Sequence, residues 1–187
     1  MQPGANLTNH FLIAMPSLQD PNFYHTVTYI CEHNDQGAMG IVINRPLEIQ
    51  LGEVFEQMEI EISYPASRQI PIFLGGPVQG DRGFVLHQPA TAWNSTLEVT
   101  DQIGVTTSRD ILEAIADARG PRNSLIALGY AGWGAGQLES EMAANAWLNG
   151  PADPGLIFET PVEQRWQAAA GLLGVDLNLL SIETGHA

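Results

Sequence analysis

Lysine is absent from the 187-residue sequence, which excludes every chemistry that depends on a lysine side chain. The chain therefore cannot form a Walker phosphate loop, a Schiff base with pyridoxal phosphate, or the lysine-dependent nucleotide site of ordinary kinases. Cysteine is nearly absent too. Because Cys31 stands alone, no disulfide can form within the chain, as is typical of proteins in a reducing compartment.

Long hydrophobic runs are also missing. The longest apolar run near the N-terminus covers residues 11–15, which is too short for a signal peptide or a membrane-spanning helix. We therefore expect a cytoplasmic protein that makes no contact with membranes.

Positive charge is scarce. Seven arginines stand against 21 acidic residues, which gives a net charge of −14. Nucleic acids and anionic lipids are bound by clustered cations. The arginines are instead scattered, at positions 45, 68, 82, 109, 119, 122 and 165. The composition argues against direct binding to nucleic acid, and the acidity is most simply explained by solubility.

The pattern of apolar residues predicts one domain over residues 1–187, with most strands early and most helices late. The expected strands are 11–15, 26–33, 37–45, 70–78, 83–88, 124–132 and 155–160, with a hairpin over 97–107. The expected helices are 51–58, 109–119, 137–148 and a last one that follows residue 160 and stops at 174. Strands 26–33 and 37–45 form a β-hairpin, while Ser108 and the segment 160–163 are expected to cap the helices after them. Because regular βαβ alternation is missing, the fold class is α+β.

Four segments occur in an order that points to one family: CEHNDQGAMGIVINRP, LGGPVQGDRGFVLH, GYAGWGAGQLESEMAANAWL and a closing GHA. On these segments the sequence resembles the AlgH/YqgE family, small bacterial proteins largely of unknown function. The resemblance implies a single α+β domain with a branched, mixed and antiparallel sheet, part of it closed into a small barrel and flanked by helices. One family name comes from a proposed role in regulating alginate production, and the family also carries a transcriptional-regulator label. No agreed catalytic residues come with it.

The segment 129–136 places four glycines between an expected strand and an expected helix, where proteins often bind phosphate. It does not fit a dinucleotide-binding fingerprint, because Gln137 stands where the third glycine is required. Glu139 and Glu141 in the first turn of the helix would repel an anion. We therefore favour a tight structural turn packed beneath an indole over an anion site.

Polar side chains lie beside the apolar stripe of the expected helix 137–148. Glu141 and Asn145 are one turn apart, and with Gln137 they would either line a pocket or make structural hydrogen bonds to nearby backbone, which we favour. Trp147 is expected to point to the opposite side of this helix. The candidate ligand-binding residues of this region are Trp133, Gly134, Gln137, Glu141 and Asn145.

Cysteine and histidine on the strand 26–33 offer a candidate zinc site. Cys31 and His33 alternate on one strand face, His25 directly precedes the strand, and thiolate with imidazole suits zinc. A zinc site normally needs three or four protein ligands, and the remaining histidines are distant in the sequence. We expect no metal and no cofactor, with Cys31 acting as a small buried apolar side chain.

Two strand ends carry polar side chains that are suited to a cleft. Asn44 and Arg45 end one strand and His87 ends another, so the three would meet if these strands were neighbours. Arg45 would then be a rare cation able to anchor a carboxylate or a phosphate. The alternative, which we favour, is a structural arginine that donates hydrogen bonds to loop carbonyls.

No catalytic signature is present, since the sequence contains no Gly-x-Ser-x-Gly and no serine that is spaced with a histidine in a recognisable nucleophile elbow. The sequence predicts a non-enzymatic regulatory or binding protein whose partner is a protein or a small molecule. The alternative is a hydrolase-type enzyme with a cleft lined by His87, Arg45 and Glu141. Geometry separates the two: an enzyme requires His87 to reach a carboxylate in a sizeable pocket, whereas a binding protein requires an apolar or Gly/Trp-lined patch without such a pair.

Overall fold

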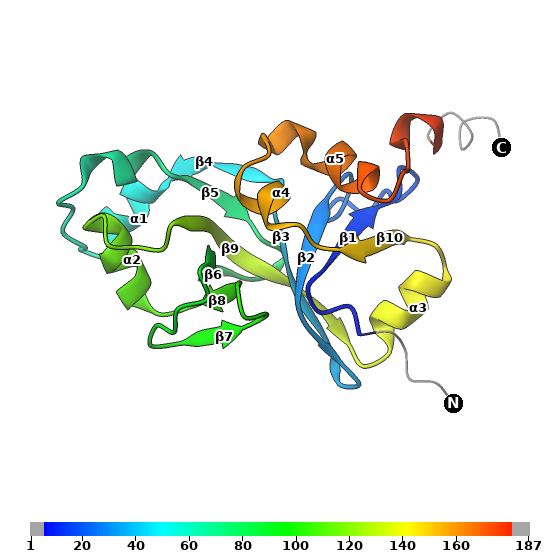
Figure 1. Ribbon diagram of the computed structural model, residues 1–187, viewed down its shortest axis with the longest axis horizontal. Helices are drawn as coiled ribbons and strands as arrows, with labels where there is room; N and C mark the ends of the chain where they lie inside the picture. Colours follow the sequence, from blue (N-terminus) through cyan, green and yellow to red (C-terminus); the bar gives the residue numbers. More distant parts are fainter. Residues whose placement is uncertain (1–5, 181–187) are drawn as a thin grey trace.

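The computed structural model describes residues 6–180, in which ten strands form one continuous sheet (Figure 1). The strands are β1 (His10–Ala14), β2 (Val27–Asn34), β3 (Gly37–Val42), β4 (Pro46–Gln50), β5 (Pro71–Leu74), β6 (Val78–Gln88), β7 (Thr96–Glu98), β8 (Gly104–Thr106), β9 (Asn123–Gly134) and β10 (Trp147–Pro151). The helices are α1 (Leu51–Gln57), α2 (Arg109–Ala116), α3 (Gln137–Ala143), α4 (Pro154–Phe158) and α5 (Arg165–Gly171), with short 3-10 helices η1 (Pro65–Gln69) and η2 (Val162–Gln164).

β9 is the branch point of the sheet, because it pairs with three other strands. Its last residues pair with β3, and its earlier residues pair with β6 in antiparallel and with β5 in parallel orientation. These pairings confirm the expected mixed sheet of an α+β protein. The hairpin of β2 and β3 is confirmed as well, with Asn34 opposite Gly37 at its turn.

The expectation of a small closed barrel is wrong, because the sheet is open. The main path runs β10-β1-β2-β3-β9-β6-β8-β7. A barrel closes only when its end strands pair with each other. Within the part of the chain that the structure describes, β10 pairs only with β1 and β7 pairs only with β8.

Three groups of buried apolar side chains hold the helices against the sheet. The largest includes Tyr29 and Cys31 on one face of β2, as the alternation of that strand predicts. A second group surrounds Phe55 between α1, α2 and the sheet, and a third contains Trp133 and Trp147 beside α3. Helices α1 and α2 lie at one end of the molecule and α3 at the other, with α4 and α5 between them along the top of the view (Figure 1). None of the helices within residues 6–180 has the length and apolarity that crossing a membrane requires.

The segment 155–160, expected as a strand, begins as helix α4, so that expectation is wrong. Its Leu-Ile-Phe run suits a strand by composition. The residues before the run favour a helix instead. The Asp153 carboxylate accepts a hydrogen bond from the Gly155 amide at 3.1 Å, and Pro154 occupies the first helical position. Both are signals that begin a helix.

Two helices begin differently from what the sequence predicts. α5 starts at Arg165, after η2, and so the segment 160–163 does not cap it. α2 starts where expected, but the hydroxyl of Ser108 donates to the Asp110 carboxylate at 2.6 Å instead of accepting from a helix amide. Asp110 itself accepts from the Ile111 amide at 3.0 Å. The carboxylate is a strong acceptor and therefore accepts the hydrogen bond that the Ser108 hydroxyl donates.

The helix expected over residues 137–148 ends at Ala143, and the expected position of Trp147 on that helix is wrong. Asn145 has a φ of 60°, the left-handed conformation that commonly follows the end of a helix and that asparagine tolerates. The chain then enters β10, which pairs with β1, and Trp147 is buried there.

Candidate functional site

Asn44 and Arg45, which follow β3, hold the loop before β2 in place through hydrogen bonds. The Arg45 guanidinium donates hydrogen bonds to three carbonyl oxygens of the loop 21–24, at 2.8, 2.8 and 3.0 Å. The Asn44 side chain accepts from the amide of Val27 and donates to the carbonyl of His25, both at 2.9 Å. Arg45 therefore does what the favoured alternative predicts, and both side chains hold this loop in place.

His87 does not meet Asn44 or Arg45, because β9 lies between β3 and β6 in the sheet. The His87 ring is buried, with Nδ1 2.9 Å from the carbonyl oxygen of Pro89 and Nε2 2.7 Å from the hydroxyl of Thr106. Burial lowers the pKa of His87, against the opposing effect of the Pro89 carbonyl. The enzyme hypothesis requires a hydrogen bond from His87 to a carboxylate, and none of the hydrogen bonds of His87 to described residues is of that kind.

Four of the predicted ligand-binding residues come together around the Glu141 carboxylate. Its Oε1 accepts hydrogen bonds from the indole nitrogens of Trp133 and Trp147, at 3.1 and 3.0 Å. Its Oε2 accepts from the amide of Gln137 at 2.9 Å, and the Gln137 oxygen accepts from the backbone amide of Gly134 at 3.0 Å. Glu141 thus makes structural hydrogen bonds, but to side chains, where the favoured interpretation expected nearby backbone.

The two indoles around Glu141 also pack on one another and on Phe23. The Phe23 ring stacks on Trp133 with centroids 5.9 Å apart, and it meets Trp147 edge-on at 5.3 Å. The hydrogen bonds of Glu141 and the packing of the two indoles join α3 to both β9 and β10. The polar side chains of α3 in this network therefore stabilise the fold. Asn145 lies outside the network, beyond the end of α3.

Cys31, His33 and His25 have separate environments. Cys31 is buried, and burial raises the pKa of its thiol far above the ordinary value. His33 Nδ1 accepts from the amide of Leu7 at 2.9 Å, while its Nε2 lies 3.4 Å from Glu139 Oε1. The His25 ring is stacked between two aromatic rings. Nowhere in residues 6–180 do three or more His, Cys, Asp or Glu side chains gather in a way that could hold a metal ion.

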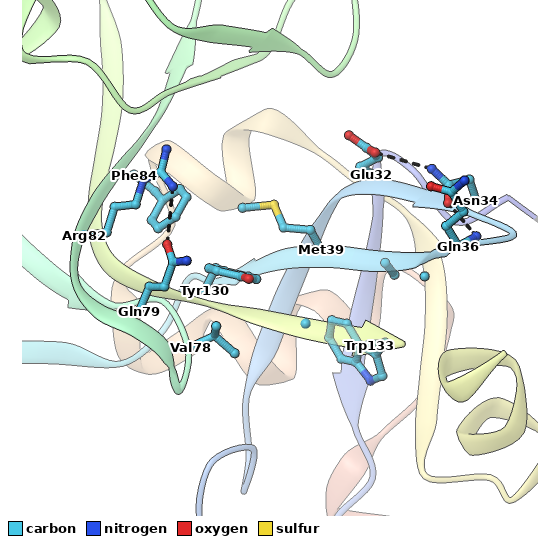
Figure 2. Close-up of a pocket in the computed structure, with 13 residues that line it drawn as sticks. Glu32, Asn34, Gln36, Met39, Val78, Gln79, Arg82, Phe84, Tyr130 and Trp133 are labelled. Atoms are coloured by element: carbon cyan, nitrogen blue, oxygen red, sulfur yellow. Dashed lines mark hydrogen bonds between the residues drawn. The ribbon is translucent and has the colours of Figure 1, made fainter. Parts of the chain in front are cut away.

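An open cleft of about 570 Å³ lies elsewhere, on the sheet where β3, β9 and β6 meet (Figure 2). Its floor follows from strand alternation. Along the end of β9, Ala131 and Trp133 face the core, so Tyr130 and Gly132 face the opposite side. Met39 lies directly across from Gly132 on β3 and shares that face. Because Gly132 has no side chain, the ring of Tyr130 can pack against the strand there: a Cβ at Gly132 would lie 3.2 Å from that ring.

The cleft has two polar walls on either side of Met39 (Figure 2). The wall formed by β6 carries Arg82, and the opposite wall, formed by the β2–β3 hairpin, carries Glu32 and Asn34. Trp133 borders one end of the cleft, although its indole nitrogen is occupied by Glu141.

Arg82 is the cation of this cleft. Its guanidinium lies 5.5 Å above the centroid of the Phe84 ring, which in turn packs edge-on against Tyr130 at 5.5 Å. Its hydrogen bonds, to the side chains of Gln79 and Thr107, are long, at 3.3 and 3.4 Å. No ion pair joins it to a carboxylate among the described residues. Arg82 is therefore positioned to receive an anionic group.

Sequence reasoning missed this cleft because it ended the expected strand at residue 132 and read the four-glycine segment as a turn. β9 in fact continues to Gly134, and only residues 135 and 136 form the turn before α3. The signal was present: the glycines at 132 and 134 alternate with Ala131 and Trp133, which is the period of a strand with one bare face.

Known proteins match the sequence and the fold over nearly their whole length. The AlgH-like family model, DUF179, covers residues 11–178. A UPF0301 protein of Thioalkalivibrio sulfidiphilus is 63% identical over 187 residues, which is 100% of both chains. A UPF0301 protein of Nitrosococcus oceani is 58% identical over 179 residues, which is 96% of each chain.

Solved structures agree with this match. The solution structure of the AlgH protein from Pseudomonas aeruginosa is similar with a TM-score of 0.81 and 53% identity, over 97% of this chain and 96% of that one. A crystal structure of a protein from Corynebacterium diphtheriae has a TM-score of 0.74 over 97% of this chain and 94% of that one, and at 18% identity it shows the fold alone. The chain therefore belongs to the AlgH-like family of UPF0301 proteins.

Proposed function

We propose that this AlgH-like chain is a non-enzymatic, single-domain binding protein of the cytoplasm, and that the glycine-floored cleft holds its ligand. One observation carries the proposal: the cleft that Gly132 and Tyr130 line also contains Arg82, a cation that pairs with no described carboxylate. A concave, partly apolar site of several hundred cubic ångströms with few polar groups is typical of small-molecule binding.

The chemistry of the walls narrows the ligand to a molecule with one anionic end and a flat apolar part. A guanidinium pairs well with a carboxylate or a phosphate, which places the anionic group at Arg82. The flat part would rest on Met39 and on the ring of Tyr130, which packs against Gly132. Glu32 on the opposite wall would repel a second anionic group, so the proposed ligand carries its negative charge at one end only.

The surroundings of His87 support binding over hydrolysis. A hydrolase-type site needs a base that is oriented by a third group and directed into a cleft. His87 instead bonds to Thr106 and to the Pro89 carbonyl, and it does not line the cleft.

The arginines support a regulatory role through a ligand or a protein partner instead of direct contact with DNA. Arg68, Arg109 and Arg119 each pair with a carboxylate, at 3.1, 3.4 and 2.9 Å. Arg45 and Arg165 donate to backbone carbonyls. Duplex DNA binding depends on clustered free cations, so any effect on transcription would act through the cleft or through a partner.

We expect phenyl phosphate, an aromatic anion, to bind in the cleft and to bind at least about tenfold more weakly to an Arg82→Gln variant. Losing a charge-assisted hydrogen bond costs roughly 1.5–3 kcal/mol, and a tenfold change in affinity corresponds to about 1.4 kcal/mol. Amide chemical shifts of Met39 and Gly132 during a titration followed by NMR measure the affinity. Arg68→Gln, which removes an exposed arginine outside the cleft, is the matched control. Equal affinity of wild type and Arg82→Gln would contradict the proposal.

A further inference from the structure

A second cavity lies between α1, α2 and the sheet. These two helices lie at one end of the molecule (Figure 1). Its volume is about 430 Å³, and none of the residues that line it lines the cleft. Its lining is largely aliphatic. The side chains that matter below are Val54, Met58, Ile72, Leu112, Ile126 and Leu128.

The cavity is unusual because it opens into a packed apolar core. Ile72 and Ile126, which line it, have exposed fractions of only 0% and 3% and belong to the core group around Phe55. Protein interiors are packed about as densely as organic crystals, and voids larger than a water molecule are few. The hydroxyls of Thr106 and Ser108, which also line the cavity, are already hydrogen-bonded to His87 and Asp110. The apolar inner part therefore offers water few partners and suits small apolar molecules. Its size falls within the range of small-molecule sites.

Charges at the rim restrict what can enter. Arg109 is already engaged: it donates to the carbonyl of Met58 at 2.7 Å, and its Nε lies 3.4 Å from a carboxylate oxygen of Glu113. Asp81, also at the rim, is exposed and forms no ion pair with any residue that the structure describes. Arg109, the cation among the lining residues, is therefore engaged, and an anionic head group would meet the Asp81 carboxylate. The Arg82 guanidinium lies 3.4 Å from the hydroxyl of Thr107 at this cavity, but it is held over the ring of Phe84, which lines the cleft.

We propose that this cavity is a binding site for a small, uncharged apolar molecule, in addition to the cleft. The aliphatic lining supplies the affinity by removing apolar surface from water. The rim supplies the selectivity by disfavouring fatty acids and other amphiphiles with a negative head group. The argument does not depend on any ligand of the cleft.

The test is a titration with two probes of equal chain length, 1-octanol and octanoate, followed by NMR of methyl groups. We expect saturable shifts of the Ile72, Ile126 and Leu128 methyls with octanol, and at least a tenfold weaker effect with octanoate. The Met39 methyl reports the cleft and should not move. Absence of saturable shifts with octanol, or equal or tighter binding of octanoate, would overturn the proposal.

Two variants fill the cavity and complete the test. Leu112→Trp on α2 should abolish the octanol shifts, and Val54→Phe on α1 serves the same purpose if the first variant does not fold. Leu97→Trp places the same new ring on an exposed position outside the cavity, and it should bind octanol like wild type. Unchanged octanol binding by a folded, cavity-filled variant would show that the site is elsewhere and would also overturn the proposal.

Discussion

Replacing Gly129 by alanine is expected to lower the free energy of unfolding by about 3 kcal/mol, from the combined costs of a left-handed alanine and of a steric overlap. Gly129 has a φ of 77°, and a Cβ placed on it would lie 2.4 Å from the carbonyl oxygen of Gly76 and 3.1 Å from that of Val78. Both neighbours are backbone atoms and cannot move aside cheaply. The loss should be visible in urea unfolding followed by circular dichroism.

The matched control for this prediction is Gly134→Ala on the same strand. A Cβ at Gly134 would meet only the Gln137 side-chain oxygen, at 4.0 Å, and no positive φ restricts the position. We expect a change of less than about 1 kcal/mol there, as for most exposed sites without special geometry. If the two variants lost similar stability, Gly129 would not be needed for the close approach of β9 to the segment around Gly76.

Replacing Glu141 by alanine is expected to cost about 3 kcal/mol. The change removes the acceptor of three hydrogen bonds and leaves the indole nitrogens of Trp133 and Trp147 without a protein partner. Both tryptophans are buried, with exposed fractions of 5% and 4%. An unsatisfied buried donor costs roughly 1–3 kcal/mol. The free energy of unfolding in urea measures the loss.

Glu141→Gln separates the roles of the two carboxylate oxygens. The glutamine keeps one oxygen for the two indoles but faces Gln137 with an amide nitrogen, so it should lose only about 1 kcal/mol, the usual worth of one hydrogen bond. Equal losses in the alanine and glutamine variants would mean that the indole hydrogen bonds do not hold α3 in place.

Local patterns in the sequence predicted much of the sheet and several side-chain roles. The β2–β3 hairpin follows from β-branched residues on either side of the turn at 34–37, and the alternation along β2 places Cys31 in the core. The role of Arg45 was also predictable. An arginine beside a loop with unpaired carbonyl groups donates its hydrogen bonds to those carbonyl oxygens, as Arg45 does.

Other features depend on distant parts of the chain and could not be predicted locally. The segment 155–160 is a separate case: its composition suits a strand, and the local cap at Asp153, with Pro154 at the first helical position, makes it helical. The second indole at Glu141 comes from Trp147, whose place is fixed by the pairing of β10 with β1. The cleft itself requires β6, β9 and β3 to meet, and no local pattern specifies which strands are neighbours.

The glycines of β9 thus have two different tasks. Gly129 allows close backbone approach in a left-handed conformation, while Gly132 makes room for the Tyr130 ring on the floor of the cleft. The first task concerns stability and the second concerns binding, so variants at the two positions should affect different measurements.

The central claim is that the ligand binds in the cleft on whose floor Gly132 lies. It is tested most directly by identifying the small molecules that glycine variants retain. Gly132→Val places a side chain on the cleft floor, whereas Gly134→Val adds the same side chain to the same strand face, at a residue that does not line the cleft. Each protein is purified natively from bacterial cells, and retained small molecules are identified by mass spectrometry. We predict an anionic small molecule retained by wild type and by Gly134→Val and absent from Gly132→Val. Equal retention by Gly132→Val, or no retained molecule in wild type, would contradict the cleft as the ligand site.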